Sequence, residues 1–230
     1  MGEVDQAFIQ AGEHRPKLDT IETQGIPIPL IDLSTIDLKL LVSEIADACK
    51  NWVFFQVINH GVPLELFTKI NTAAKTFFHL TIEQKTKVKR DAVNSYGYHE
   101  SEHTKNVRDW KEVFDFLIKD PSFLPASPDP EDQEIRTLSN QWPQNLPQFS
   151  FNSYFEDHTS MIRFNHYPPC PCPELALGVG QHKDAGALTI IVQDDVGGLQ
   201  VKRKSYGVWV PVKSTPNAFF VNVGYTVQVT

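Results

Sequence analysis

The most informative stretch of the chain is residues 181–193, which read QHKDAGALTIIVQ. The run Ala187–Gln193 is rich in β-branched and apolar residues, which predicts a short strand. Just before it, a histidine and an aspartate stand two residues apart, and in an extended segment such residues point to the same side. His182 and Asp184 are therefore presented together, while Lys183 points away. They match two ligands of a 2-His-1-carboxylate facial triad for Fe(II), although a lone histidine–x–aspartate pair is more often only a polar strand end.

Short strands with Gly or Pro between them surround this stretch. Turns are predicted at Gly197-Gly198 and at Tyr206-Gly207. Such spacing is typical of a β-sandwich or barrel. The predicted strands of this region are Met161–Tyr167, Ala187–Gln193, Leu199–Lys202, Trp209–Pro211 and Ala218–Val223.

The first of these strands begins a second polar motif, residues 163–171, which read RFNHYPPCP. Alternation places Arg163, Asn165 and Tyr167 on one face and Phe164 and His166 on the other. Polar groups inside a barrel need partners, and a bound carboxylate would supply one. A polar outer face explains the pattern equally well.

The first 90 residues follow a β-α-β-α-α pattern after a loose polar arm at residues 1–25. Capping signals stand at Ser34 with Asp37 and at Thr81 with Gln84. The predicted elements are a strand at Ile28–Leu33, a helix presenting Leu38, Leu41, Ile45, Cys49 and Trp52, a strand at Val53–Ile58, a helix after Pro63 presenting Leu66, Ile70, Ala73 and Phe77, and a short third helix.

From Asp91 to Ser150 the pattern weakens. Residues 96–98 are predicted to be a loop and residues 113–118 a strand. The Pro-, Asp- and Ser-rich residues 119–150 are predicted to be a long loop or linker.

Composition excludes several classes of protein. The net charge of −7 argues against nucleic-acid binding, which needs a basic face. No apolar run approaches the roughly 18 residues of a membrane span, and the N-terminus lacks the features of a signal peptide, so a cytoplasmic protein is expected. Three cysteines cannot build a disulfide scaffold, and a zinc site at Cys170 and Cys172 would need histidines as well.

Five blocks in order resemble the plant Fe(II)/2-oxoglutarate-dependent dioxygenases, the family that includes flavonol synthase and anthocyanidin synthase. These blocks are Ile28–Leu33, Trp52–Pro63, Arg108–Phe116, Asn165–Pro171, and Gln181–Gln193 with Gly197–Val201. The resemblance implies an α+β, mainly β protein with an incomplete double-stranded β-helix (jelly-roll) core and a helical N-terminal region. It divides the chain into an N-terminal region at 1–118, a linker at 119–155 and a jelly-roll domain at 156–230.

The resemblance also implies a site. His182 and Asp184 would be iron ligands, and Asn165 and Tyr167 would contact 2-oxoglutarate. Fe(II) would be the cofactor, 2-oxoglutarate the cosubstrate and ascorbate the reductant. The substrate would be a small plant metabolite that is hydroxylated or desaturated.

Several positions depart from the family pattern. None of the eight histidines follows His182, and His166 is out of phase with the site, so the distal iron-binding His has no counterpart. The family's Arg-x-Ser, which clamps 2-oxoglutarate, is matched only by Arg203-Lys204-Ser205, upstream of where it belongs. Val53 replaces a Gly, which we expect to matter little, and Tyr225 replaces an Asp.

These departures suggest a truncated member whose iron affinity is low. A jelly roll uses about eight strands, so we expect an unpaired apolar edge at Phe219–Val223 and self-association through it. The alternative to an oxygenase is a catalytically inactive relic or interaction protein.

Overall fold

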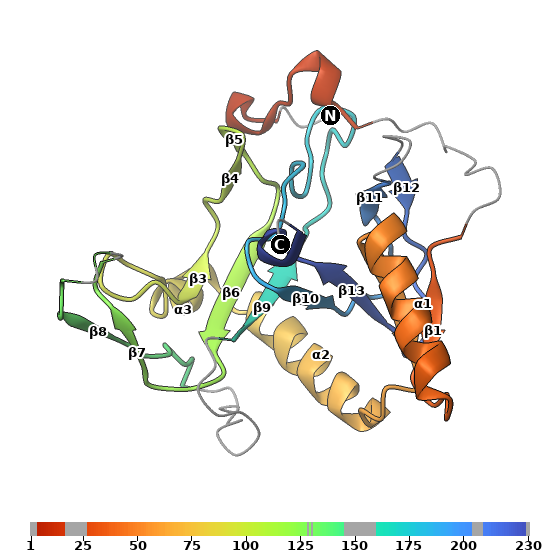
Figure 1. Cartoon of the computed structure of the whole chain (residues 1–230). Coiled ribbons are helices and arrows are strands. Elements are labelled where there is room, and N and C mark those ends of the chain that lie inside the picture. The colour runs from red at the N-terminus through yellow and green to blue at the C-terminus, as the bar shows by residue number, and fades with distance from the viewer. Residues whose placement is uncertain are drawn as a thin grey trace. The chain divides into compact units, whose positions relative to one another are not determined.

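The computed structural model describes residues 4–16, 27–127, 129, 131–144, 160–203 and 209–228 (Figure 1). The chain forms two units, one of Met1–Pro16 with Phe67–Gln181 and the other of Lys17–Leu66 with His182–Thr230. The predicted turn at Tyr206-Gly207, residues Lys204 and Ser205, and residues 1–3 and 17–25 of the predicted arm lie outside the described residues.

The second unit is built on a four-stranded sheet of order β1-β2-β13-β10. Strand β1 runs parallel to β2, and β13 is antiparallel to both β2 and β10. Helix α1 covers one face and the antiparallel β11–β12 pair packs on the other, so the middle of the sheet is buried on both sides. The elements of this unit are β1 (Leu30–Asp32), α1 (Leu38–Asn51), β2 (Phe54–Ile58), β10 (Leu188–Ile191), β11 (Gln200–Lys202), β12 (Trp209–Pro211), β13 (Phe219–Val223) and α4 (Tyr225–Gln228).

The expectation of an unpaired edge at Phe219–Val223 is wrong. Strand β13 pairs on both sides, because β2 from the N-terminal part of the chain inserts beside it. The edge strands of this sheet are β1 and β10, and on β10 Leu188 is 61% exposed and Ile190 is 60% exposed. Their cross-strand partners Val223 and Val221 are buried, since α1 covers the middle of the sheet and leaves its edge open.

Helix α1 begins as its sequence suggests, but with a different cap. Asp37 accepts hydrogen bonds from the backbone N–H groups of Lys39 and Leu40, whereas Ser34 instead donates to Asp32. Leu41, Ile45 and Cys49 face the core as predicted, but Leu38 is exposed because it precedes the first turn that reaches the sheet.

Val53 matters more than the sequence suggests. It is buried and has a φ of +70°, a left-handed conformation that a β-branched residue adopts at a cost of about 1–2 kcal/mol. The conformation lets the Val53 carbonyl accept a hydrogen bond from the Val223 N–H at 3.0 Å. A glycine would take this backbone conformation without strain.

The first unit contains a three-stranded sheet of order β3-β6-β9, with aromatic side chains packed on one face. Phe77, Phe114 and Phe116 are almost fully buried there, with Phe164 packed against them. The elements are η1 (Gln6–Phe8), η2 (Gly12–His14), α2 (Leu64–Phe78, begun in the second unit), α3 (Ile82–Thr86), β3 (Gly97–His99), β4 (His103–Thr104), β5 (Val107–Arg108), β6 (Glu112–Leu117), β7 (Ser122–Pro125), β8 (Ile135–Leu138) and β9 (Met161–His166).

Some local expectations for this unit are confirmed and others are wrong. The Thr81–Gln84 capping box is present. The predicted loop at 96–98 instead begins β3, which is a strand because β6 pairs with it. The predicted loop at 119–150 contains the β7–β8 hairpin, and on α2 Phe67 is buried in place of Leu66.

Candidate functional site

The histidine–x–aspartate motif brings its two side chains together as predicted. His182 Nε2 lies 3.2 Å from Asp184 Oδ1, just before β10. The side chain of His182 is 49% exposed and that of Asp184 is 23% exposed, so neither is sealed in the core. The hydrogen bond from His182 lowers the pKa of Asp184, and further hydrogen bonds from Thr189 and Asn222 act in the same direction. Asp184 is therefore a carboxylate at neutral pH, as a metal ligand must be.

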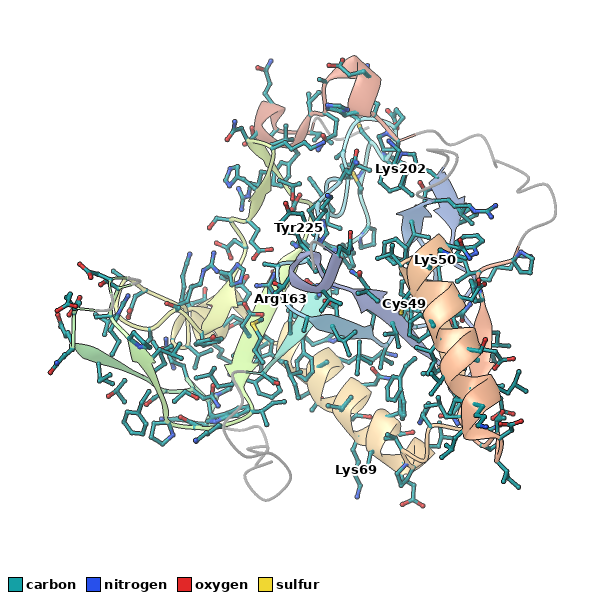
Figure 2. All side chains as sticks on the ribbon, viewed as in Figure 1. Cys49, Lys50, Lys69, Arg163, Lys202 and Tyr225 are labelled. Carbon is teal, nitrogen blue, oxygen red and sulfur yellow. The ribbon has the colours of Figure 1, made fainter. Side chains whose placement is uncertain are left out.

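The end of β13 holds the loop that carries this pair. The Tyr225 N–H donates to the Asp184 carbonyl at 2.7 Å, and the Gly224 N–H donates to the Ala187 carbonyl at 2.8 Å. Tyr225, labelled in Figure 2, also places its ring under the Lys183 ammonium at 4.9 Å. Lys183 therefore has a partner away from His182 and Asp184, and the departure at Tyr225 has a structural role.

The donor set fits part of an Fe(II) site. An imidazole nitrogen and a carboxylate oxygen are two members of a facial triad. Within the described ranges, however, no group of three His, Cys, Asp or Glu side chains could hold a metal. Cys170 and Cys172 form no disulfide and belong to no such group, so the zinc alternative finds no support in this part of the chain.

In the first unit, the face of β9 opposite the aromatic core carries the predicted polar side chains. Asn165 is paired with Val113 and Arg163 with Asp115 in the β6–β9 register. His166 lies on the other face, stacked on Phe78 with ring centroids 5.1 Å apart. The alternation predicted from the sequence is therefore confirmed.

Arg163 is already paired with carboxylates of the chain itself, so it needs no bound carboxylate as a partner. Its Nε and Nη2 donate to the two carboxylate oxygens of Asp115, each at 2.7 Å, and its Nη1 lies 3.0 Å from Glu102. Arg163 is labelled in Figure 2. Burial raises the pKa of Asp115, but hydrogen bonds from His99 and Arg163 outweigh burial and hold the pKa below its usual value. The Arg163 guanidinium therefore forms ion pairs within the chain, with Asp115 and Glu102.

The pair belongs to a larger network that the sequence did not reveal. Glu102 accepts from Lys111 at 2.7 Å, and Asp109 accepts from Thr104 and from the Gly180 N–H. The only signal was the Arg108–Phe116 block, which includes Asp109, Lys111 and Asp115 but does not identify their partners.

Tyr167 lies just beyond this network. Its ring packs so closely on Gly178 that a Cβ there would lie 2.6 Å from Tyr167 Cδ1. Tyr167 is 50% exposed, and partial burial together with the charge of Asp109 raises its pKa to about 12. The neutral phenol of Tyr167 and the exposed amide of Asn165 are suited to donate hydrogen bonds to a carboxylate.

Arg203, the first residue of the upstream Arg-x-Ser, packs over the Trp52 ring at 4.6 Å, which is a structural role.

No helix in the described part of the chain is both long and apolar enough to cross a membrane.

Two family models match the chain. Residues 28–145 match the non-haem dioxygenase in morphine synthesis N-terminal model, and residues 158–230 match the 2OG-Fe(II) oxygenase superfamily model.

Similar curated proteins come from plants. Thebaine 6-O-demethylase of Papaver somniferum is 32% identical over 262 residues, covering 100% of this chain and 71% of the relative. Feruloyl CoA ortho-hydroxylase 2 of Arabidopsis thaliana is 34% identical over 222 residues, covering 88% of this chain and 61% of the relative. Flavonol synthase/flavanone 3-hydroxylase of Eustoma exaltatum subsp. russellianum is 30% identical, covering 96% and 73%. The chain thus spans between three fifths and three quarters of the length of these relatives.

Solved structures share the fold. JOX2 in complex with 2OG, Fe and JA aligns with a TM-score of 0.73 and 27% identity, over 100% of this chain and 71% of that one. AtDAO1 of Arabidopsis thaliana in complex with 2-oxoglutarate aligns with a TM-score of 0.64 and 24% identity, over 88% and 81%.

Proposed function

Because the chain belongs to the 2OG-Fe(II) oxygenase superfamily, we propose that His182 and Asp184 are two of its iron ligands and that Asn165 and Tyr167 bind 2-oxoglutarate. The family, its jelly-roll fold, and its Fe(II) and 2-oxoglutarate are those predicted from the sequence, and these predictions are confirmed. Ascorbate is the typical reductant of the family.

The 3.2 Å approach of His182 Nε2 to Asp184 Oδ1 carries the proposal, because it places two ligand atoms of the required types side by side. When bound, iron and 2-oxoglutarate supply the oxidation of the substrate. The chain's own residues bind the metal and orient the cosubstrate. His182 and Asp184 hold the metal, while Asn165 and Tyr167 donate hydrogen bonds to the cosubstrate. We propose a small plant metabolite as the substrate, in a hydroxylation or desaturation.

The number of ligands limits the activity expected of these 230 residues. A facial triad needs a second histidine, and no histidine follows His182. We therefore propose that the 230-residue chain binds Fe(II) weakly and turns over 2-oxoglutarate slowly or not at all. The division into residues 1–118, 119–155 and 156–230 and the cytoplasmic location stay predictions.

The test is succinate formation from 2-oxoglutarate by the 230-residue chain, with and without Fe(II), beside Mn(II) titration. Asp184→Ala and His182→Ala should each weaken Mn(II) binding and abolish any iron-dependent succinate. His103→Ala is the matched control, because His103 is an exposed histidine whose ring bonds the Ser101 carbonyl, away from His182 and Asp184 in the sequence. Equal Mn(II) affinity in the parent, Asp184→Ala and His182→Ala proteins would refute the assignment.

A second candidate is an interaction protein without activity, and the exposed apolar side chains of β10 favour it. Leu188 and Ile190 project from an edge strand, a geometry that promotes pairing with another strand. Concentration-dependent mass by light scattering tests this idea. Ile190→Lys should keep the chain monomeric, and a parent chain that is already monomeric at high concentration would eliminate this candidate.

A further inference from the structure

The two oxygens of Asp184 have different partners. Oδ1 is the oxygen that lies 3.2 Å from His182 Nε2. Oδ2 accepts a hydrogen bond from Asn222 Nδ2 at 2.6 Å, which is short for an amide donor on a carboxylate. One oxygen is therefore turned toward the second ligand and the other is held by the sheet.

The position of Asn222 in the sheet allows it to hold the Asp184 side chain in one orientation. Asn222 lies on β13, which pairs with β2 on one side and β10 on the other, so its backbone is held from both directions. Its cross-strand partner on β10 is Thr189. Asn222 therefore reaches Asp184 from a strand that is paired with β10 (Figure 1 shows the strand pair).

The backbone beyond Asn222 is attached to the same loop. Tyr225 N–H bonds the Asp184 carbonyl, and Thr226 Oγ1 donates to the Ala185 carbonyl at 2.5 Å. A shift of the carboxylate would have to break the Asn222 bond or move this whole strand end. The rotation of Asp184 is therefore set by β13 rather than by the exposed loop.

We propose that Asn222 is a positioning residue for the metal: by occupying Oδ2 it leaves Oδ1 as the single ligand oxygen, so that Asp184 binds in a monodentate manner beside His182. The inference rests on the proposed function of His182 and Asp184. Asn222 itself does not touch the metal. Hydrogen-bond partners of metal ligands typically change metal affinity by about 10–100-fold when removed.

The experiment titrates Mn(II) into the full 230-residue chain and follows free Mn(II) by electron paramagnetic resonance. Asn222→Ala should weaken binding by roughly 10–100-fold. The infrared carboxylate bands of the Mn(II)-loaded protein should change from a monodentate to a bidentate splitting, a change that loss of stability alone would not produce. Asn222→Gln, which keeps the amide donor, should restore part of the affinity.

Val221→Ala is the matched control. Val221 is the neighbouring β13 residue and is buried in the core under α1, so its truncation lowers the unfolding temperature without touching Asp184. We expect its Mn(II) affinity to equal that of the parent chain.

The outcomes separate the two proposals. If Asp184→Ala weakens binding while Asn222→Ala does not, the positioning role is refuted and the iron site stands. If neither weakens binding, or if the parent chain binds no Mn(II), both are refuted. If Val221→Ala weakens binding as much as Asn222→Ala, the effect is one of fold stability and the positioning role is likewise refuted.

Discussion

Replacement of Asp115 by Asn should destabilise the chain more than removal of any exposed carboxylate. The Asp115 side chain is only 3% exposed. It accepts two hydrogen bonds from Arg163, each at 2.7 Å, and its Oδ2 lies 3.3 Å from His99 Nε2. Breaking a buried pair by removing one partner costs about 3–5 kcal/mol. Arg163 is one-third exposed and water can solvate part of it, so we expect the lower end, about 3 kcal/mol.

The assay is urea unfolding at pH 7 of Asp115→Asn, Arg163→Met and the double variant. Because each single variant leaves its partner unpaired, the double variant should lose less than the sum, with a coupling of about 1–3 kcal/mol. Glu131→Gln removes one exposed carboxylate as a control and should change stability by less than about 0.5 kcal/mol. If the loss of the double variant equals the sum of the two single losses to within about 0.5 kcal/mol, Asp115 and Arg163 do not interact in solution.

The same pair predicts a pH dependence. The folded pKa of Asp115 lies below the ordinary value of an aspartate, so the stability that its carboxylate contributes is fully present above that ordinary value. It is lost as the pH falls through the lower folded pKa. The parent chain should therefore lose stability on acidification below about pH 4, and Asp115→Asn should lose less over that range. Parallel acid curves for the two proteins would contradict this reasoning.

Three further predictions concern single positions. Asp37→Ala should cost about 1 kcal/mol of unfolding free energy in urea because it removes the α1 cap, while Ser34→Ala should leave that helix start intact; equal losses would reverse the assignment. Gly178→Ala should displace the Tyr167 ring and weaken 2-oxoglutarate binding by up to about tenfold in calorimetry, and an unchanged affinity would remove Tyr167 from the proposed cosubstrate contacts. Phe77→Ala should cost about 3–5 kcal/mol by opening a cavity in the aromatic core, and a loss below about 1 kcal/mol would mean that this core is loosely packed.

Much of the candidate site was readable from local sequence. His182 and Asp184 meet because residues i and i+2 of an extended segment share a side, and Arg163 and Asn165 share a face of β9 for the same reason. The Thr81–Gln84 box was also readable, because a capping box is completed within one helical turn.

The remaining features depend on residues far apart in the chain. Asp115 meets Arg163 across 48 residues and Asn222 meets Asp184 across 38, so neither pairing follows from spacing. The strand expected to be an open edge is central because β2 inserts beside it. The sequence by itself determined which atoms are presented together along one strand, since backbone geometry enforces that locally. Only the tertiary structure decided which partner each polar group has, because the order of strands in a sheet is set by long-range packing.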